Sequence, residues 1–314
     1  MGLKTPPSLI EKADETLGKN LIFLIPACFV IGYLTKSFMP QLKWSATYVL
    51  FTIMFASTYG LRWADFFSLG ERKNLIITGI MGQTLLLPLI AHIISITFYS
   101  PDSPWRVGHL CVAASPAAIS TIIWSRISKG DVALGVVLVG LHVILVPFLA
   151  PVILKIFVGK SAHVPLFALF LKLFLSVFVP TIAAVVLYER HKTETPKPFF
   201  SAWAKLGMLY MIVLNTSVAF SAVPLSLHML KLLGIMAIQV SCFYLTGICV
   251  GRLLKTPEKA QITFSYFMGM KNNGAALVMA LSGFPLKATL PVALAIMCQQ
   301  PLASFIDRYW RSKK

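Results

Sequence analysis

Apolar segments of about 20 residues follow one another along almost the whole chain. Main-chain polar groups find no partners in the hydrocarbon of a bilayer, so each such segment is expected to cross it as a helix. With 57% hydrophobic and 12% charged residues, the composition excludes an ordinary soluble domain. We therefore predict an all-α polytopic membrane protein with ten spans, at residues 20–35, 44–61, 74–99, 105–126, 131–158, 164–188, 200–222, 229–251, 260–282 and 286–306.

The basic residues indicate how the spans are oriented. A net charge of +17 would suit a nucleic-acid partner, but Lys and Arg are dispersed over short loops and form no cluster interleaved with aromatic residues. If the N-terminus is cytoplasmic, most of the 28 Lys and Arg residues fall on the inner side. We predict both termini in the cytoplasm, a bacterial inner membrane as the location, and no nucleic-acid partner.

Residues 1–18 are expected to be a lead-in to the membrane, because they mix acidic and basic residues and have no apolar stretch of the signal-peptide kind. Residues 19–314 then form a single membrane domain. The five cysteines all fall within apolar spans and show no CxxC spacing, so we interpret them as small buried hydrophobic residues. No pair of His residues has ligand spacing, and we predict neither a metal site nor a cofactor.

Ten spans form two sets of five, and we place the boundary between the sets near the polar link at residues 189–198. Because five is an odd number, a second copy of the same repeat must insert with inverted topology. Pro26 and Pro180 each lie inside the first span of their half. We therefore predict two inverted repeats, over residues 19–188 and 199–308.

The fourth span of each half is interrupted. In the first half, Pro116 removes a main-chain hydrogen bond among small residues, although a simple kink in a packed helix is the alternative. In the second half, the run Gly269–Gly274 places Lys271 beside Asn272 and Asn273 in an apolar segment. A lysine at mid-membrane costs about 2.5–3.5 kcal/mol on insertion scales. Because interrupted helices at this depth often line a transport site, we predict such a site here.

Three motifs lie at the third, fourth and ninth spans. Residues 79–88, GIMGQTLLLP, are similar to the pattern GxxxQFxxMP, with Thr84 and Leu87 in place of Phe and Met. Residues 115–121, SPAAIST, and residues 129–134, KGDVAL, are similar to CPGGTASN and RGNVAL. The run GMKNNG at residues 269–274 is similar to the end of EVGMQNSG. In order and spacing the motifs resemble the bile acid:sodium symporter family, within the superfamily of bile acid, arsenite and riboflavin transporters.

The resemblance implies a fold and a function. Its fold has a panel domain of spans 1, 2, 6 and 7 and a core domain of spans 3–5 and 8–10, with spans 4 and 9 broken and crossing beside the substrate cavity. Family members carry organic anions, commonly with two sodium ions, by alternating access. The expected partners are therefore a small organic anion, carboxylate or bile-acid-like, and the lipid bilayer. A monomer is expected because one chain holds both repeats.

The positions that would hold sodium in such a family differ in this chain. The family has Ser and Asn after the crossover proline, two hydroxyl-bearing residues in the fifth span, and a carboxylate and a Gln in the ninth. Here these positions carry Thr121, Ile122, Gly135, Val139, Phe267 and Lys271. Sodium prefers oxygen ligands, and only Gln83, Asn272 and the Thr121 hydroxyl remain to supply them. We therefore expect transport to be independent of sodium.

Lys271 has three possible roles at this point. Its ammonium group could stand where a sodium ion would sit, donating hydrogen bonds to Gln83, Asn272 or unwound main-chain carbonyls. Because burial disfavours a charged amine, Lys271 could instead exchange a proton during transport. It could also bind the substrate directly. His142, one turn beyond the altered fifth-span positions, is either a proton acceptor or a packing histidine. Proton-coupled and facilitative transport both stay open.

Several polar residues are candidates for contact with the substrate. They are Ser120, Thr121, Asn272, Asn273, Asn215 and Thr216. Those at the crossover lie where helix N-termini can present N–H groups to a carboxylate, between Pro116 on one side and Gly269 and Gly274 on the other. The seventh-span pair, Asn215 and Thr216, could equally form hydrogen bonds between helices.

Three other functions are weighed against a sodium-independent carrier. They are a sodium-coupled organic anion symporter with atypical sites, a non-transporting receptor-like homologue and an arsenite efflux permease. Arsenite permeases of the superfamily carry a cysteine after the fourth-span proline and an acid in the ninth span, where this chain has Ala117 and Phe267. We do not expect an enzyme, because the span interiors contain no acidic residue to pair with a nucleophile or base.

Overall fold

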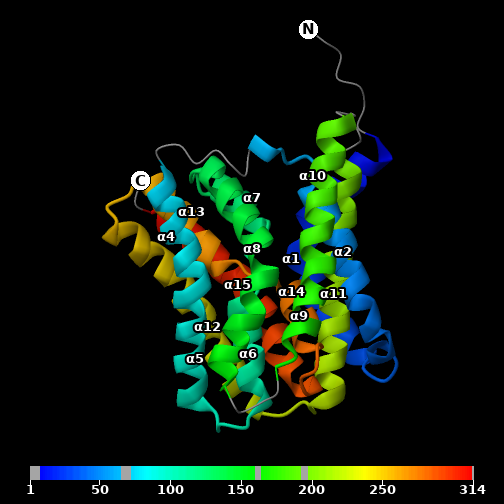
Figure 1. Cartoon of the computed structure of the whole chain (residues 1–314). Coiled ribbons are helices and arrows are strands. Elements are labelled where there is room, and N and C mark those ends of the chain that lie inside the picture. Colours follow the sequence, from blue (N-terminus) through cyan, green and yellow to red (C-terminus); the bar gives the residue numbers. More distant parts are fainter. Residues whose placement is uncertain (1–7, 65–71, 160–163, 192–196, 313–314) are drawn as a thin grey trace.

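The computed structural model describes residues 8–64, 72–159, 164–191 and 197–312, which are almost entirely helical (Figure 1). The helices are α1 (Leu9–Leu34), α2 (Ser45–Thr58), α4 (Lys73–Met81), α5 (Leu87–Phe98), α6 (Pro104–Ala114), α7 (Ser120–Ile127), α8 (Val132–Val158), α9 (Leu166–Leu173), α10 (Val179–His191), α11 (Lys197–Ala222), α12 (His228–Leu253), α13 (Glu258–Gly269), α14 (Asn273–Ala280) and α15 (Thr289–Arg311). Short turns η1 (Met39–Trp44) and η6 (Leu286–Ala288) are 3₁₀-helical, and η3 (Gly82–Leu86) and η5 (Phe174–Phe178) are π-helical.

Six helical segments of the described chain are long and apolar enough to cross a membrane, or seven if the bent helix α1 counts as one span. The six are Lys73–Phe98, Val132–Val158, Leu166–His191, Pro198–Ala222, Met229–Leu253 and Leu286–Arg311. The other predicted spans coincide with α2, which has 14 residues, and with the interrupted pairs α6–α7 and α13–α14. The all-helical membrane class is confirmed, and the count of ten spans stays a prediction.

Two of the long segments contain a π-helical turn just before a proline. Turn η3 joins α4 to α5 ahead of Pro88, and η5 joins α9 to α10 ahead of Pro180. Because proline has no N–H to donate, a helix must rearrange its hydrogen bonds at this point, and a π turn allows the chain to continue. Turn η3 contains Gln83, one of the predicted site residues.

The helices pack in two groups (Figure 1). In one group α1 lies against α11, α11 against α2, and α2 against α10. In the other, α12 packs on α13 and α15, and α6 packs on α5, α8 and α15. The α12–α13 contact is so close that a side chain at Gly247 would collide with the main-chain oxygen of Phe264. The groups meet where α8 contacts α9, α11 contacts α15, and α14 contacts α2.

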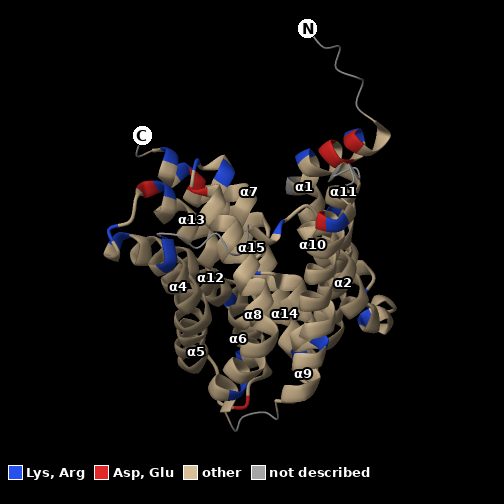
Figure 2. Ribbon diagram, turned by 45° about the horizontal axis from the view of Figure 1, so that its top comes forward, with Lys and Arg blue, Asp and Glu red and all other residues tan. Residues whose placement is uncertain are grey.

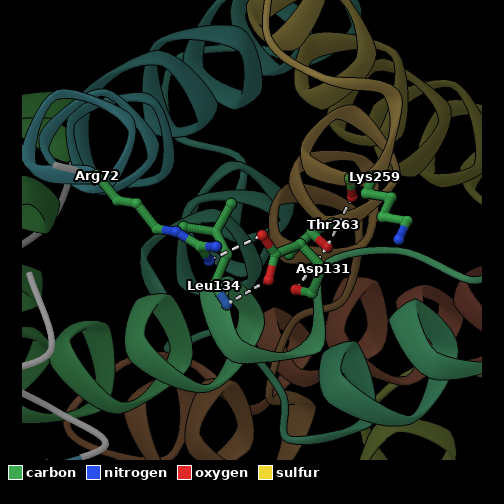
Figure 3. A network of polar contacts seen from close by, with 5 residues as sticks. All are labelled: Arg72, Asp131, Leu134, Lys259 and Thr263. Atoms are coloured by element: carbon green, nitrogen blue, oxygen red, sulfur yellow. Dashed lines mark hydrogen bonds and ion pairs between the residues drawn. The ribbon is translucent and has the colours of Figure 1, made fainter. Parts of the chain in front are cut away.

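Asp131 ties three helices together at one end of the second group (Figure 3). Its carboxylate accepts a hydrogen bond of 3.0 Å from the main-chain N of Leu134, which caps α8, and forms an ion pair of 2.8 Å with Arg72. Its main-chain N donates to the carbonyl of Lys259, and its own carbonyl accepts from the hydroxyl of Thr263. The starts of α4, α8 and α13 are thereby held at fixed positions.

Helix α1 begins and α15 finishes at the same end of the molecule (Figure 1), and Lys and Arg residues gather at that end (Figure 2). Residues 8–18 of the predicted lead-in are the first turns of α1, started by a reciprocal capping box between Ser8 and Glu11. Residues 1–7 lie outside the described chain, as do residues 192–196 of the polar link.

Candidate functional site

Two interrupted helices meet inside the protein. Residues 115–119 separate α6 from α7, and residues 270–272 separate α13 from α14. Pro116 explains the first interruption, because a proline pushes the residue before it into the extended conformation found at Ser115. At the second interruption, the side chain of Asn272 accepts a hydrogen bond of 3.1 Å from the N–H of Ala275 and so starts α14 as its N-cap.

The two non-helical segments pair with each other as a short antiparallel bridge between Ala117 and Lys271. Two main-chain hydrogen bonds flank the bridge, from Ala118 N to Met270 O at 2.9 Å and from Asn272 N to Pro116 O at 2.8 Å. Main-chain groups that lose their helical partners at membrane depth require other partners, and the pairing supplies them. We call residues 115–119 and 270–272 together the crossover.

His142 of α8 binds the first segment of the crossover, residues 115–119. Its Nδ1 accepts a hydrogen bond of 3.0 Å from the main-chain N of Ala117. Because Nδ1 is the acceptor, a neutral ring carries its proton on Nε2. The imidazole is buried, and the ring of Phe267 contacts it edge-on. In this structure the hydrogen bond of His142 Nδ1 therefore goes to the main chain of the crossover.

Gln299 of α15 binds the second segment of the crossover, residues 270–272. The sequence analysis did not identify Gln299 as a site residue. Its Oε1 accepts from the main-chain N of Lys271 at 3.1 Å and from Nδ2 of Asn273 at 3.2 Å. Its Nε2 donates to the main-chain O of Lys271 at 3.1 Å. A polar amide in the middle of an apolar span was the signal that could have identified this residue.

The terminal amino group of Lys271 is one of the unsatisfied polar groups of the site. The side chain is only 1% exposed, and its Nζ has no hydrogen-bond partner among the residues that the structure describes. Among the described residues, Nζ therefore forms none of the hydrogen bonds to Gln83, Asn272 or unwound carbonyls that belong to the first of its three possible roles. The amide of Asn272 is engaged elsewhere, because its Oδ1 caps α14 and its Nδ2 approaches the sulfur of Met54 at 3.3 Å.

Most of the positions that could bind a cation have no side-chain oxygen free to do so. Thr121 donates its hydroxyl to the main-chain O of Tyr266 at 3.3 Å, and Phe267 is fully buried. Gln83 is 1% exposed, and neither atom of its amide has a hydrogen-bond partner within the described residues. Of the three side-chain oxygens available to a cation, that of Gln83 is therefore free within the described residues, that of Asn272 caps α14, and that of Thr121 donates to a carbonyl.

Asn272 and Gly274 lie on the side of the crossover that faces the other helix group. Besides the contact of Asn272 with Met54, a side chain at Gly274 would lie 3.3 Å from Leu50 and 3.5 Å from Met211. These three apolar residues belong to α2 and α11. Ser120, at the first turn of α7, is half-buried. The polar crossover thus faces an apolar wall.

The polar patch of the seventh span contacts neighbouring helices. With its amide turned to satisfy both atoms, Asn215 donates to the main-chain O of Thr289 at 3.2 Å and accepts from the N of Ala293 at 3.1 Å. Thr216 is fully buried and so close to Gly32 that a side chain there would approach its Cβ to 2.6 Å. Asn215 thus forms hydrogen bonds between helices, whereas the Thr216 hydroxyl has no hydrogen-bond partner among the described residues, and a role for either residue in substrate contact stays a prediction.

Comparison with known proteins gives consistent matches. A sequence model of the sodium bile acid symporter family matches residues 47–224, more than half of this chain. The chain is 23% identical over 304 residues to the uncharacterized protein YbaS of Bacillus subtilis (strain 168), covering 90% of this chain and 93% of that protein. It is 22% identical over 308 residues to the uncharacterized sodium-dependent transporter YocS of the same organism, covering 97% and 95%. It is also 24% identical over 324 residues to the probable sodium/metabolite cotransporter BASS2, chloroplastic, of Oryza sativa subsp. japonica, covering 98% and 75%.

Proposed function

Because this chain belongs to the sodium bile acid symporter family, and is therefore an integral membrane transporter and not an enzyme, we propose that it carries a small organic anion by a cycle that does not use sodium. The observation that carries the proposal is the buried ammonium of Lys271 at the crossover, next to positions where sodium would need oxygen. The names of YocS and BASS2 assign sodium to those proteins. This chain shares the family's motifs but carries different side chains at the positions that the resemblance assigns to sodium.

A fixed positive charge is a physical substitute for a bound cation. Lys271 lies in the non-helical segment itself, so its charge sits where two helices are interrupted. Phe267 offers a hydrocarbon ring where the family has a carboxylate, and the Thr121 hydroxyl is already engaged with a carbonyl. A sodium ion placed here would lack ligands and would be repelled by the ammonium group.

The surroundings of the crossover support a substrate with one negative charge and an apolar body. In its protonated form the Lys271 amino group has three N–H donors, none of them used within the described residues, and is complementary to a carboxylate. On the opposite side, Leu50, Met54 and Met211 present aliphatic and thioether groups. Methionine side chains adapt to varied apolar shapes, which suits a small carboxylate or a bile-acid-like molecule.

We also propose the family architecture for this chain, with ten spans in two inverted five-span repeats. The bounds 19–188 and 199–308 that we predicted would divide the spans six and four, so the first repeat ends with α8 and the second begins with α9. The group of α1, α2, α10 and α11 would be the panel, and the group around α6, α8, α12, α13 and α15 the core. Alternating access would arise from movement of the core, with its crossover, against the panel. The gathering of basic residues at the end where α1 begins and α15 finishes supports cytoplasmic termini (Figure 2). We further propose a monomer in a bacterial plasma membrane.

Two forms of the cycle fit this proposal. In the first, Lys271 keeps its proton and transport is facilitative. In the second, it releases and rebinds a proton, so that uptake follows a proton gradient. Uptake into proteoliposomes with and without an imposed pH gradient distinguishes the two forms.

One observation favours a second candidate, a sodium-coupled symporter with atypical ligands. Gln83 keeps a buried amide oxygen without a hydrogen-bond partner in the described chain, at a position that the family resemblance assigns to sodium. The sodium named for YocS and BASS2 points the same way.

The test is thermal unfolding of the purified protein against a panel of small carboxylates, in sodium chloride and in choline chloride. A ligand that binds the folded state raises the melting temperature by mass action. We expect at least one carboxylate to raise it equally in both salts, and Lys271→Met to abolish the rise. A rise that needs sodium, or stabilisation by sodium alone, would establish the second candidate. A protein that responds to no carboxylate and takes up none in proteoliposomes would favour a non-transporting homologue.

A further inference from the structure

His142 and Gln299 occupy corresponding places in the two halves of the chain. His142 is the eleventh residue of α8, and Gln299 is the eleventh residue of α15. Each helix follows the interrupted pair of its own half, α6–α7 and α13–α14. Each of the two side chains is buried and binds the main chain of the residue that forms the bridge, Ala117 or Lys271.

His142 and Gln299 differ in the number of hydrogen bonds that they form with the crossover. His142 provides one acceptor, at 3.0 Å from the main-chain N of Ala117. Gln299 binds both the N–H and the carbonyl of Lys271 and also the amide of Asn273. The main-chain O of Gln299 in turn accepts the hydroxyl of Tyr244 at 3.0 Å. The second half of the crossover is therefore fixed at more points than the first.

We propose that His142 and Gln299 are a matched pair of positioning residues, one from each half, that clamp the crossover and set the direction of the Lys271 and Asn273 side chains. Each segment of the crossover contributes two consecutive main-chain donors. Those of Ala117 and Lys271 bind the clamp side chains, and those of Ala118 and Asn272 bind the opposite segment. Loss of one clamp frees its own strand and loosens the bridge to the other. The consequence for transport rests on the proposed function, whereas the clamp itself does not.

The neighbouring residue provides a matched control for Gln299. Gln300 has the same side chain on the next position of α15, but its Oε1 accepts from the indole N–H of Trp124 at 3.2 Å and does not contact the crossover. The variants Gln299→Met and Gln300→Met remove the same chemical group from the same helix. Only the first removes partners of the crossover.

The test is hydrogen–deuterium exchange of the intact protein in lipid nanodiscs, read on peptides covering residues 115–121 and 268–275. We expect Gln299→Met to accelerate exchange about tenfold over Lys271 and Asn272, with a smaller increase over Ala117 and Ala118, because each lost buried hydrogen bond exposes its donor. Gln300→Met should leave both peptides at wild-type rates. Unchanged exchange in Gln299→Met, or equal acceleration in both variants, would overturn the proposal.

A conservative replacement separates positioning from general packing at His142. The Oδ1 of an asparagine lies close to the place of histidine Nδ1 and can accept the same hydrogen bond. We expect His142→Asn to keep wild-type exchange over Ala117 and His142→Leu to accelerate it. Equal exchange in these two variants would show that no acceptor is needed there and would overturn the pairing.

The exchange readout needs no substrate, so the two proposals fail separately. If Gln299→Met does not fold, Gln299→Glu keeps the acceptor for the main-chain N of Lys271 and for Nδ2 of Asn273. We expect it to protect the Lys271 N–H from exchange while freeing the carbonyl of Lys271. Rapid exchange at Lys271 N in Gln299→Glu would contradict the clamp. A protein whose clamp is established but which binds no carboxylate contradicts only the proposed function.

Discussion

The ring of Phe267 packs edge-on against the imidazole of His142, with ring centroids 5.8 Å apart. Both side chains are buried, and the only hydrogen bond that the structure shows for the imidazole binds the main-chain N of Ala117. The contact lies where the family resemblance expects a carboxylate. An aromatic pair offers a cation no oxygen ligand, which is the packing that the proposed sodium-independent cycle requires at this position.

Replacement of Lys271 by methionine should raise stability and remove transport. The Lys271 ammonium has no hydrogen-bond partner among the described residues, and an apolar side chain of similar length removes its desolvation cost. We expect a gain of about 1–3 kcal/mol in the free energy of unfolding, measured by thermal or denaturant unfolding in detergent. The main-chain bonds of Lys271 to Gln299 are unaffected by this change.

The control for this variant is Lys172→Met, at a half-buried position of α9. It should change the free energy of unfolding by less than about 0.5 kcal/mol. A Lys271→Met protein that melts below the wild type would mean that the folded state uses the ammonium as a structural cation with partners of its own.

The close contact between α12 and α13 predicts opposite effects for two glycines of α12. A methyl group at Gly247 would collide with the main-chain oxygen of Phe264, whereas the space around Gly234 is open within 4 Å. We expect Gly247→Ala to destabilise the protein by about 1–3 kcal/mol, because neither main chain can move freely. Gly234→Ala should stabilise it by up to about 1 kcal/mol through helix propensity. Melting temperatures of the two variants test the packing, and similar values would contradict it.

Asp131 combines a helix cap with an ion pair, and the two parts can be separated. The Arg72 side chain is 49% exposed, so solvent screens its pairing with Asp131 and we expect Arg72→Gln to cost less than about 0.5 kcal/mol. Asp131→Asn keeps an oxygen for the N–H of Leu134, whereas Asp131→Ala leaves the start of α8 without its cap. We therefore expect Asp131→Ala to cost about 1 kcal/mol more than Asp131→Asn. Equal losses measured by denaturant unfolding would show that charge, and not capping, is what Asp131 contributes.

The sequence predicted the interruptions because their causes are local. Pro116 lacks an N–H, and the polar run from Lys271 to Asn273 cannot remain unpaired in an apolar helix, so both breaks follow from residue type. The capping box of Ser8 and Glu11 had an equally local signal, and it begins α1 within the part described as a lead-in.

The contacts that complete the site were beyond sequence reasoning because they join distant segments. Gln299 lies 28 residues from Lys271 in the chain, and the bridge between Ala117 and Lys271 joins the two halves. The side chain of Asn215 is of a type that could contact a substrate, yet the arrangement of α11 and α15 turns its amide toward Thr289 and Ala293. These contacts depend on which helices become neighbours in the fold. Hydrophobic periodicity and residue type do not determine this.

A gain of sodium dependence is the strictest check on the reading of the ion positions. The double variant Phe267→Glu, Lys271→Gln restores the carboxylate and the amide that the family resemblance assigns to these positions and removes the fixed charge. Gln83 remains as a further side-chain oxygen without a hydrogen-bond partner in the described chain. We expect sodium to stabilise this variant by about 2.7 kcal/mol at a hundredfold excess over its dissociation constant, and not to stabilise the wild type.

Both single variants serve as controls for the double variant. Lys271→Gln alone lacks the carboxylate, and Phe267→Glu alone is expected to form an ion pair with Lys271, so neither should respond to sodium. The measurement is the melting temperature in sodium chloride against choline chloride at equal ionic strength. If the wild type itself is stabilised by sodium, Lys271 does not replace an ion and the sodium-coupled alternative is correct. If the double variant folds but ignores sodium, the two residues are not what separates this chain from a sodium-binding relative.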